Sequence, residues 1–168
     1  MPASGPWLIL IGGCFATLAV IAVSFRLTVS FLRSVLLRRI SETFSAGEPI
    51  LLQDLSANYF GTASAGGMQL RGNGALVLTD TSLEFLMLWP KRRLQIPLQA
   101  ITGTSIVRSH CGKTIGRDLL QVQYITDAAE DSMAWYLPDV RGWQNQLDTV
   151  RMAARAELPT VNANGSGN

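Results

Sequence analysis

The residues that could support catalysis or metal binding are few and scattered. Gly112-Lys113-Thr114 matches the end of a phosphate-binding P-loop, but that motif requires a glycine five positions before Gly112, where the chain has Val107. His110 and Cys111 could supply two metal ligands, yet no second His or Cys cluster exists to complete a set of four. With a single His, an isolated Cys111 and acidic residues mostly in predicted turns, no acid–base pair or activated nucleophile can be assembled from the sequence. We therefore predict no catalysis, no metal and no cofactor, and an exposed loop position for His110.

Two short basic segments are the best candidates for binding. They comprise Lys91, Arg92, Arg93, Arg108, Lys113 and Arg117. Such side chains can contact lipid phosphates or an acidic protein partner, and they can equally be solvated turn residues. Trp89, beside the first segment, suits either the membrane interface or packing against its own hairpin.

An uninterrupted apolar run lies near the N-terminus. Residues 7–25 contain no charged side chain, and as a helix they would be about 28 Å long, close to the hydrocarbon thickness of a bilayer. A cleaved signal peptide would carry basic residues before its apolar core. In this chain the basic residues follow the run instead, so we predict an uncleaved transmembrane anchor within residues 1–40.

The basic residues after the run predict its orientation. They are Arg26, Arg33, Arg38 and Arg39. Because basic residues beside a membrane span stay in the cytoplasm, we expect the N-terminus outside a plasma or inner membrane and the remainder of the chain in the cytoplasm. The same residues could attract anionic lipid, or act only as a topology signal. Inside the span, Gly12, Ala16 and Ala19 share nearly one helix face and could allow close approach of another membrane helix.

Charge divides the chain into two parts. Residues 1–40 carry four Arg and no acid, whereas residues 41–168 carry ten basic and twelve acidic residues, a net charge of −2. The larger part is therefore not a basic domain, and we expect no nucleic-acid partner. Partners are expected in the membrane: another membrane protein or complex, or anionic lipid headgroups.

Sequence periodicity predicts an α+β domain behind the anchor. Helical character continues through Ile40, and residues 41–57 are expected to form a linker with room for a short strand or helical turn. Alternating apolar residues then predict about seven antiparallel strands beginning near Tyr59. A closing helix after Pro138, with Asp139 as N-cap, completes a domain over residues 58–156. Residues 157–168 are rich in Asn, Gly and Ser and are expected to be disordered.

The order of these elements resembles the pleckstrin-homology (PH) superfold, in particular its GRAM-like and bacterial PH-like branch. The resemblance is carried by Gly74-Ala75-Leu76-Val77-Leu78-Thr79, by Leu83-Glu84-Phe85, by Ile96-Pro97-Leu98-Gln99-Ala100-Ile101 and by the hairpin segment Gly112 to Arg117 before Leu119 to Val122. It implies an antiparallel β-barrel or sandwich capped by a C-terminal helix. Lipid-binding members gather basic residues in the first hairpin loop, whereas residues 65–73 offer Arg71 alone.

The leading hypothesis is a non-catalytic, membrane-anchored PH-like interaction module, an accessory subunit or scaffold in a bacterial membrane complex. A chain already tied to the bilayer does not need its folded domain for recruitment, which favours contact with a neighbouring protein. The alternative is an anionic-lipid-sensing domain that uses the two basic segments.

Overall fold

The computed structural model describes residues 7–44, 48–66, 69, 71–127 and 129–156, without the side chains of residues 7–10 and 12. The expected disordered tail, residues 157–168, lies outside the described residues. In chain order the elements are α1 (Trp7–Thr43), β1 (Ile50–Thr62), the 3-10 turn η1 (Ala63–Ala65), β2 (Gly72–Thr79), β3 (Ser82–Met87), β4 (Arg92–Pro97), the 3-10 turn η2 (Leu98–Ala100), β5 (Ile101–Val107), β6 (Leu119–Ile125), β7 (Glu130–Tyr136) and α2 (Val140–Ala156).

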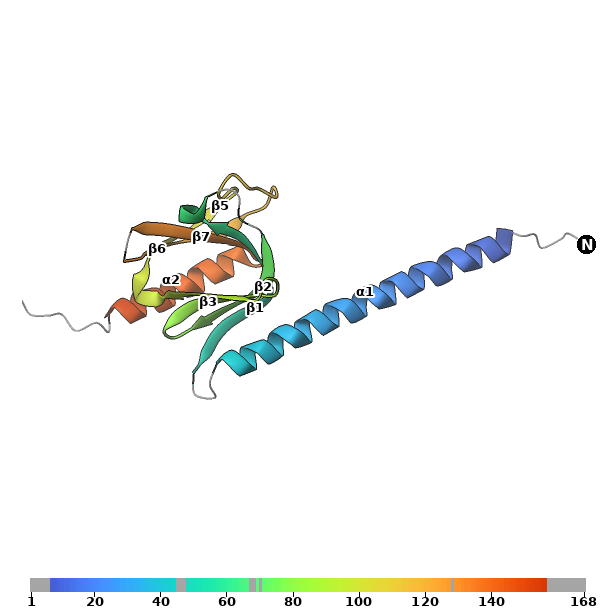
Figure 1. Cartoon of the computed structure of the whole chain (residues 1–168), viewed down its shortest axis with the longest axis horizontal. Coiled ribbons are helices and arrows are strands. Elements are labelled where there is room, and N and C mark those ends of the chain that lie inside the picture. Colours follow the sequence, from blue (N-terminus) through green and yellow to red (C-terminus); the bar gives the residue numbers. More distant parts are fainter. Residues whose placement is uncertain (1–6, 45–47, 67–68, 70, 128, 157–168) are drawn as a thin grey trace, which may run out of the picture.

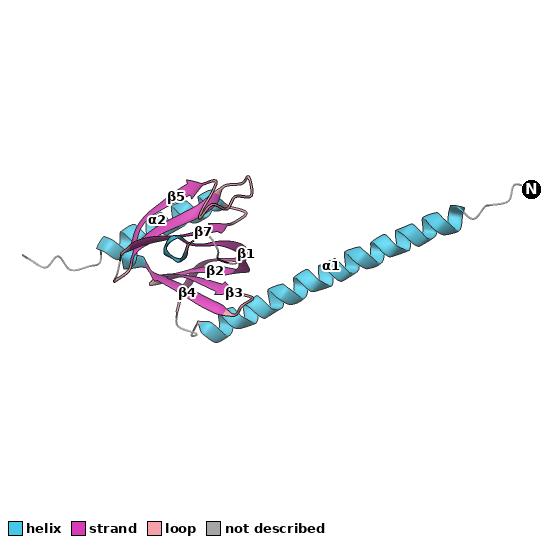
Figure 2. Cartoon of the chain, turned by 45° about the horizontal axis from the view of Figure 1, so that its top comes forward, coloured by secondary structure: helices cyan, strands magenta, loops and turns pink. Residues whose placement is uncertain are grey.

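All seven strands belong to one antiparallel sheet in the order β4-β3-β2-β1-β7-β6-β5. The sheet is open, because the two outermost strands, β4 and β5, are not paired with each other. The long strand β1 pairs with β2 along most of its length and with β7 in its second part, so it belongs to both halves (Figure 2). The predicted α+β class, seven strands and C-terminal helix are confirmed.

The core lies between the two halves of the sheet. Its centre is a group of three aromatic rings, Tyr59, Phe85 and Trp135, with centroids 5.6–6.2 Å apart. Such aromatic contacts add to the stability gained from burying apolar area. Helix α2 covers this core with Trp143 and Leu147, which are 3% and 0% exposed.

Side-chain hydrogen bonds hold α2 in place. Asp139 accepts a bond from the backbone N–H of Gly142 at 2.9 Å, as expected of an N-cap. Near the other end of α2, Arg151 and Arg155 donate to the carbonyls of Thr102 and Ile101, each at 2.9 Å. These bonds tie the helix to β5.

The segment expected to be a linker is largely regular structure, and the expected start of the first strand was wrong. Helix α1 continues to Thr43, and β1 begins at Ile50 instead of near Tyr59. Residues 50–56 pair with β2, but their side chains are exposed or only half-buried. Without a buried face, this part of the strand has no clear alternation of apolar and polar residues.

Helix α1 is continuous over 37 residues and therefore about 55 Å long. From Gly13 onwards it is long and apolar enough to cross a bilayer. Its last turns lie beside the outer face of the sheet (Figure 1). The β3–β4 turn, the β5–β6 loop and the start of α2 lie together at one end of the sheet, and this loop end faces the N-terminal part of α1 (Figure 1).

Candidate functional site

The end of α1 is packed onto the domain and is not a free tether. Leu36, Ile40 and Phe44 recur every four residues, so they form one stripe, and they are 1%, 5% and 6% exposed. They cover a small apolar surface on the outer face of β2 and β3, formed by Ala75, Val77 and Leu86. These outward positions alternate with core residues, which is why the two strands are buried on both faces. We call this contact the helix–sheet junction.

Arg39 adds hydrogen bonds to the junction. Its guanidinium donates to the backbone carbonyl of Met87 and to that of Arg92, the latter at 3.1 Å. Both acceptors flank the β3–β4 turn, so one side chain joins the helix to this turn. Arg39 was predicted as one of the juxtamembrane residues that act as a topology signal or attract anionic lipid, and the structure places its side chain in the junction. Arg38 pairs with Glu42 on the exposed side of the helix, 2.8 Å apart.

Arg93, one of the predicted binding residues, pairs with a buried carboxylate below the junction, while its own side chain is 44% exposed. Its Nε and Nη2 atoms donate to Glu84 at 2.6 and 2.7 Å, and the Glu84 side chain is completely buried. The guanidinium carbon lies 5.8 Å from the centre of the Phe44 ring. A buried carboxylate needs such a partner, since an unpaired buried charge is strongly destabilising. Arg93 therefore acts within the fold.

The β5–β6 loop is folded back onto the domain. Lys113 donates to the carbonyls of Gln69 and Phe60 at 2.5 and 3.5 Å. Arg117 donates to the Tyr136 hydroxyl at 2.8 Å. Arg108 forms an exposed pair with Asp118 at 3.5 Å, the kind of pair that contributes little stability. The basic residues of this loop thus have partners inside the domain.

His110 was expected on an exposed loop, and this expectation was wrong: the residue is 5% exposed. Its Nε2 lies 3.1 Å from the carbonyl oxygen of Gly61, and its Nδ1 lies 3.3 Å from the side-chain amide nitrogen of Gln121. Because a carbonyl only accepts, Nε2 carries the proton and Nδ1 accepts from Gln121. Burial lowers the pKa of His110, although the bond to Gly61 acts in the opposite direction. A contact 49 residues away in sequence causes this burial.

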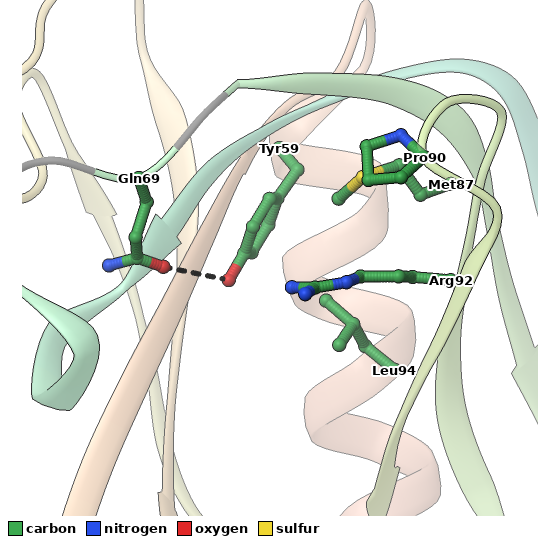
Figure 3. A pocket seen from close by; sticks show the side chains of 6 residues that line it. All are labelled: Tyr59, Gln69, Met87, Pro90, Arg92 and Leu94. Atoms are coloured by element: carbon green, nitrogen blue, oxygen red, sulfur yellow. Dashed lines mark hydrogen bonds between the residues drawn. The ribbon is translucent and has the colours of Figure 1, made fainter.

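A cavity of about 170 Å³ opens at the loop end (Figure 3). It is lined by Tyr59, Gln69, Met87, Pro90, Arg92 and Leu94. Tyr59 and Gln69 come from β1 and the β1–β2 connection, and the other four come from β3, β4 and the turn between them. Met87 and Leu94 belong to or border the core, whereas Arg92 is exposed.

The polar side chains that line this cavity differ in whether their hydrogen-bonding groups have partners. Gln69 accepts from the backbone N–H of Thr62 at 2.9 Å and donates to the carbonyls of Thr62 and Gly66. The Tyr59 hydroxyl shares a hydrogen bond with the Thr62 hydroxyl. Within the described residues, the guanidinium of Arg92 forms no hydrogen bond or ion pair. Figure 3 shows it reaching across the cavity toward the Tyr59 hydroxyl.

No ion pair neutralises Arg92 within the described residues. Asp131, which also acts on Tyr59, is hydrogen-bonded to Ser64 and Tyr124. Burial raises the pKa of the Tyr59 hydroxyl, and nearby Arg92 only opposes that effect in part. Tyr59 therefore stays a neutral phenol and does not neutralise the guanidinium. Among the described residues, no group of three His, Cys, Asp or Glu side chains is arranged to hold a metal ion.

The remaining predicted residues lie on exposed surface. Lys91 is exposed and borders a shallow groove with Val35 and Arg38 of α1. Arg26 and Arg33 line a groove on α1 nearer the N-terminus. Ala16 and Ala19 are exposed on the helix, and the side-chain surroundings of Gly12 lie outside the described residues.

Of the six residues that line the cavity, sequence reasoning singled out Arg92 alone and missed Tyr59, Gln69, Met87, Pro90 and Leu94. Tyr59 has the signal of an inward-facing core position, and Gln69 stands in a loop without a motif. Their contribution depends on β1 and β4 being brought together by the fold of the sheet. Nothing in the local sequence reports that contact.

No family model and no curated protein matches this chain. Several solved structures are similar in shape, and two of them illustrate the match. The crystal structure of the C-terminal domain of an unknown protein from Leishmania infantum has 15% identity and a TM-score of 0.47, covering 64% of this chain and 87% of that one. A chain of the 8S snRNP assembly intermediate has 11% identity and a TM-score of 0.48, covering 74% of this chain and 93% of that one. At these values neither structure identifies a family or a function.

Proposed function

We propose that this chain is a non-catalytic, single-pass membrane protein whose cytoplasmic PH-like domain, GRAM-like in its strand motifs, docks onto a neighbouring membrane protein in a fixed orientation. Its role would be that of an accessory subunit or scaffold in a bacterial membrane complex. The observation that carries the proposal is the helix–sheet junction.

The junction argues for orientation because tethering alone would not require it. A flexible linker is enough to keep a domain near a membrane. Here the helix instead runs unbroken to Thr43, and Leu36, Ile40 and Phe44 are buried against the sheet. About 20 residues of α1 suffice to cross the hydrocarbon, so the rest of the helix sets the height and rotation of the domain. Fixed geometry is useful when the domain must meet a neighbour that is held in the same bilayer.

The loop end is the surface that such a neighbour would meet. It faces along α1 toward the N-terminus, which is the direction of the bilayer if residues 7–25 form the span (Figure 1). Trp89 at the tip of the β3–β4 turn is 78% exposed. An exposed Trp beside exposed Lys91 and Arg92 is typical of a contact surface, because Trp and Arg are enriched where proteins bind one another.

The experiment is site-specific photocrosslinking of the full chain in native membranes. A photoreactive residue replaces Trp89 at the loop end or, as a control, Met152, which is 63% exposed on α2. We expect a discrete protein adduct from position 89 and none from position 152. The adduct should weaken when the junction is loosened by Arg39→Ala with Ile40→Ala, but not by Leu37→Ala on the exposed side of the helix. Adducts of equal yield at both positions, or adducts that contain lipid only, would contradict the proposal.

A second candidate function, contact with anionic lipid, is favoured by the same exposed Trp89 and Lys91. Flotation with anionic liposomes tests it, using a fragment that begins at residue 34 and so keeps the junction. The charge reversals belong at Lys91 and Arg92, since reversal of Arg93 would break its pair with Glu84. No flotation at low salt would exclude this function.

A further inference from the structure

The cavity at the loop end has the chemistry of a receptor for a single carboxylate. One wall is the guanidinium of Arg92, and most of the remaining lining is apolar, formed by Met87, Pro90 and Leu94. A guanidinium presents paired N–H donors that match the two oxygens of a carboxylate. Because Arg92 has no partner within the described residues, these donors are available to a ligand.

The polar side chains opposite Arg92 line the cavity, and their hydrogen bonds are made with groups other than the Arg92 guanidinium. Gln69 uses its amide nitrogen for two carbonyls of the β1–β2 connection and its amide oxygen for Thr62 and Tyr59. The Tyr59 hydroxyl, neutral and already bonded to Thr62, supplies no negative charge. An incoming anion would therefore meet one cation whose charge is not yet neutralised.

The number of available cations favours a carboxylate over a phosphate monoester, which carries close to two negative charges at neutral pH, whereas a carboxylate carries one. A lipid phosphodiester also carries one charge, and the nanodisc experiment below distinguishes it. The neighbouring cations are committed elsewhere: Arg93 to Glu84, Lys113 to backbone carbonyls, and Arg71 to the Phe60 ring, 4.4 Å from its centre. Lys91 lies on the groove beside α1 and not in the cavity lining. One guanidinium balances one carboxylate.

The size and the apolar floor define the rest of the ligand. A cavity of about 170 Å³ accommodates one side chain and is too small for most drug-sized molecules. Burying the carbons next to the carboxylate against Met87 and Leu94 adds apolar contact. A glutamate side chain, or a C-terminal carboxylate that follows an apolar residue, has this combination of charge and stem.

We propose that this cavity binds a carboxylate carried on a short apolar stem by the partner protein, with Arg92 as the residue that pairs with it. This inference rests on the proposed function, since it describes how the docked partner would be recognised. The partner would thus present an acidic side chain or its C-terminus to the loop end.

The test uses the full chain in phosphatidylcholine nanodiscs with methionine methyl groups labelled for NMR. Met87 lines the cavity, while Met152 on α2 and Met133 in the core serve as references for unspecific binding and for folding. The probe is 4-methylpentanoate, and its matched control is 4-methylpentanamide, which has the same shape but no charge. We expect a saturable shift of the Met87 methyl with the carboxylate and a shift at least about tenfold weaker in apparent affinity with the amide.

Two variants isolate the guanidinium. Arg92→Gln removes the charge at an exposed position, so the Met133 signal should stay in place while the affinity for the carboxylate falls at least about tenfold. Lys91→Gln removes the neighbouring charge outside the cavity and should leave that affinity within about twofold, the effect expected of a screened surface charge. An unchanged affinity in Arg92→Gln would overturn the proposal.

Other occupants give distinct results. Equal binding of the amide would show an apolar cleft without charge recognition. A larger Met87 shift with inorganic phosphate, or on adding phosphatidylglycerol to the nanodisc without any probe, would show a phosphate or lipid site. Each of these results overturns the carboxylate assignment. They are separable from failure of the proposed function, because the protein adduct at position 89 does not depend on what fills the cavity.

Discussion

Truncating Leu36 to Ala should release the end of α1 from the sheet while leaving the rest of the domain folded. Leu36 is 1% exposed and packs in a cluster that is separate from the main core. Leu→Ala changes in protein cores cost about 2–5 kcal/mol, and the lower end applies here because the cluster is small and borders solvent. A loss of about 2 kcal/mol in the free energy of docking corresponds to about a 30-fold change in the docking equilibrium.

Hydrogen exchange of the full chain in nanodiscs measures this equilibrium directly. Backbone amides of residues 36–44 open when the helix end leaves the sheet, so their exchange should accelerate by about 30-fold, in line with the lost docking energy. Amides of β6 and β7, which have no contact with the junction cluster, should keep their exchange rates. Leu37→Ala is the matched control, because Leu37 is the adjacent residue and is 46% exposed.

The comparison between the two variants decides the outcome. If Leu36→Ala and Leu37→Ala exchange at the same rate over residues 36–44, the helix end is not docked in the membrane-bound protein. The argument for a fixed orientation would then lose its basis. If β6 and β7 also accelerate in Leu36→Ala, the junction is part of the global core instead of a separate unit.

Three further predictions concern the folded domain. Arg93→Leu removes the charged partner of the buried Glu84 carboxylate and leaves it only the Ser82 hydroxyl as a donor. Because Arg93 is itself 44% exposed, the thermal midpoint should fall by an amount equivalent to about 2 kcal/mol, whereas Glu42→Gln in the exposed pair should leave it unchanged. The pKa of His110 is lowered in the folded state, so the unfolded chain binds more protons below the usual pKa of about 6.5, and denaturant stability should decline as the pH falls from 7 toward 5.5. His110→Gln should flatten that decline, and an unchanged slope would refute the assignment. Asp139→Ala removes the N-cap of α2 and should cost about 1 kcal/mol in the same denaturant assay.

The sequence was sufficient for features whose signal is local. The alternation of Leu83, Phe85 and Met87 and the stripe of Val140, Trp143 and Leu147 each report one buried face of one element. The run from Trp7 to Phe25 reports an uninterrupted apolar helix, whose described side chains are exposed. These patterns led to the helix, strand and helix that the structure contains.

The features that local patterns did not predict depend on contacts between distant segments. His110 is buried by Gly61, and the first part of β1 is recognisable as a strand only through its pairing with β2. The predicted basic segments were grouped by their position in sequence. Their roles depend on their partners in the folded domain, because Arg93 pairs with the buried carboxylate of Glu84 and Lys113 donates to two backbone carbonyls.

Arg39 connects the two features on which the functional argument depends. Its acceptors are the carbonyls of Met87 and Arg92, and both of these residues also line the cavity. Any rotation or withdrawal of α1 must therefore either break these bonds or move two walls of the cavity with it. This explains why the Arg39 side chain is directed into the domain. Under the proposed membrane anchoring, α1 would do more than hold the domain at the bilayer. It would set where the guanidinium of Arg92, unpaired within the described residues, lies relative to the bilayer, and hence which neighbour can reach it.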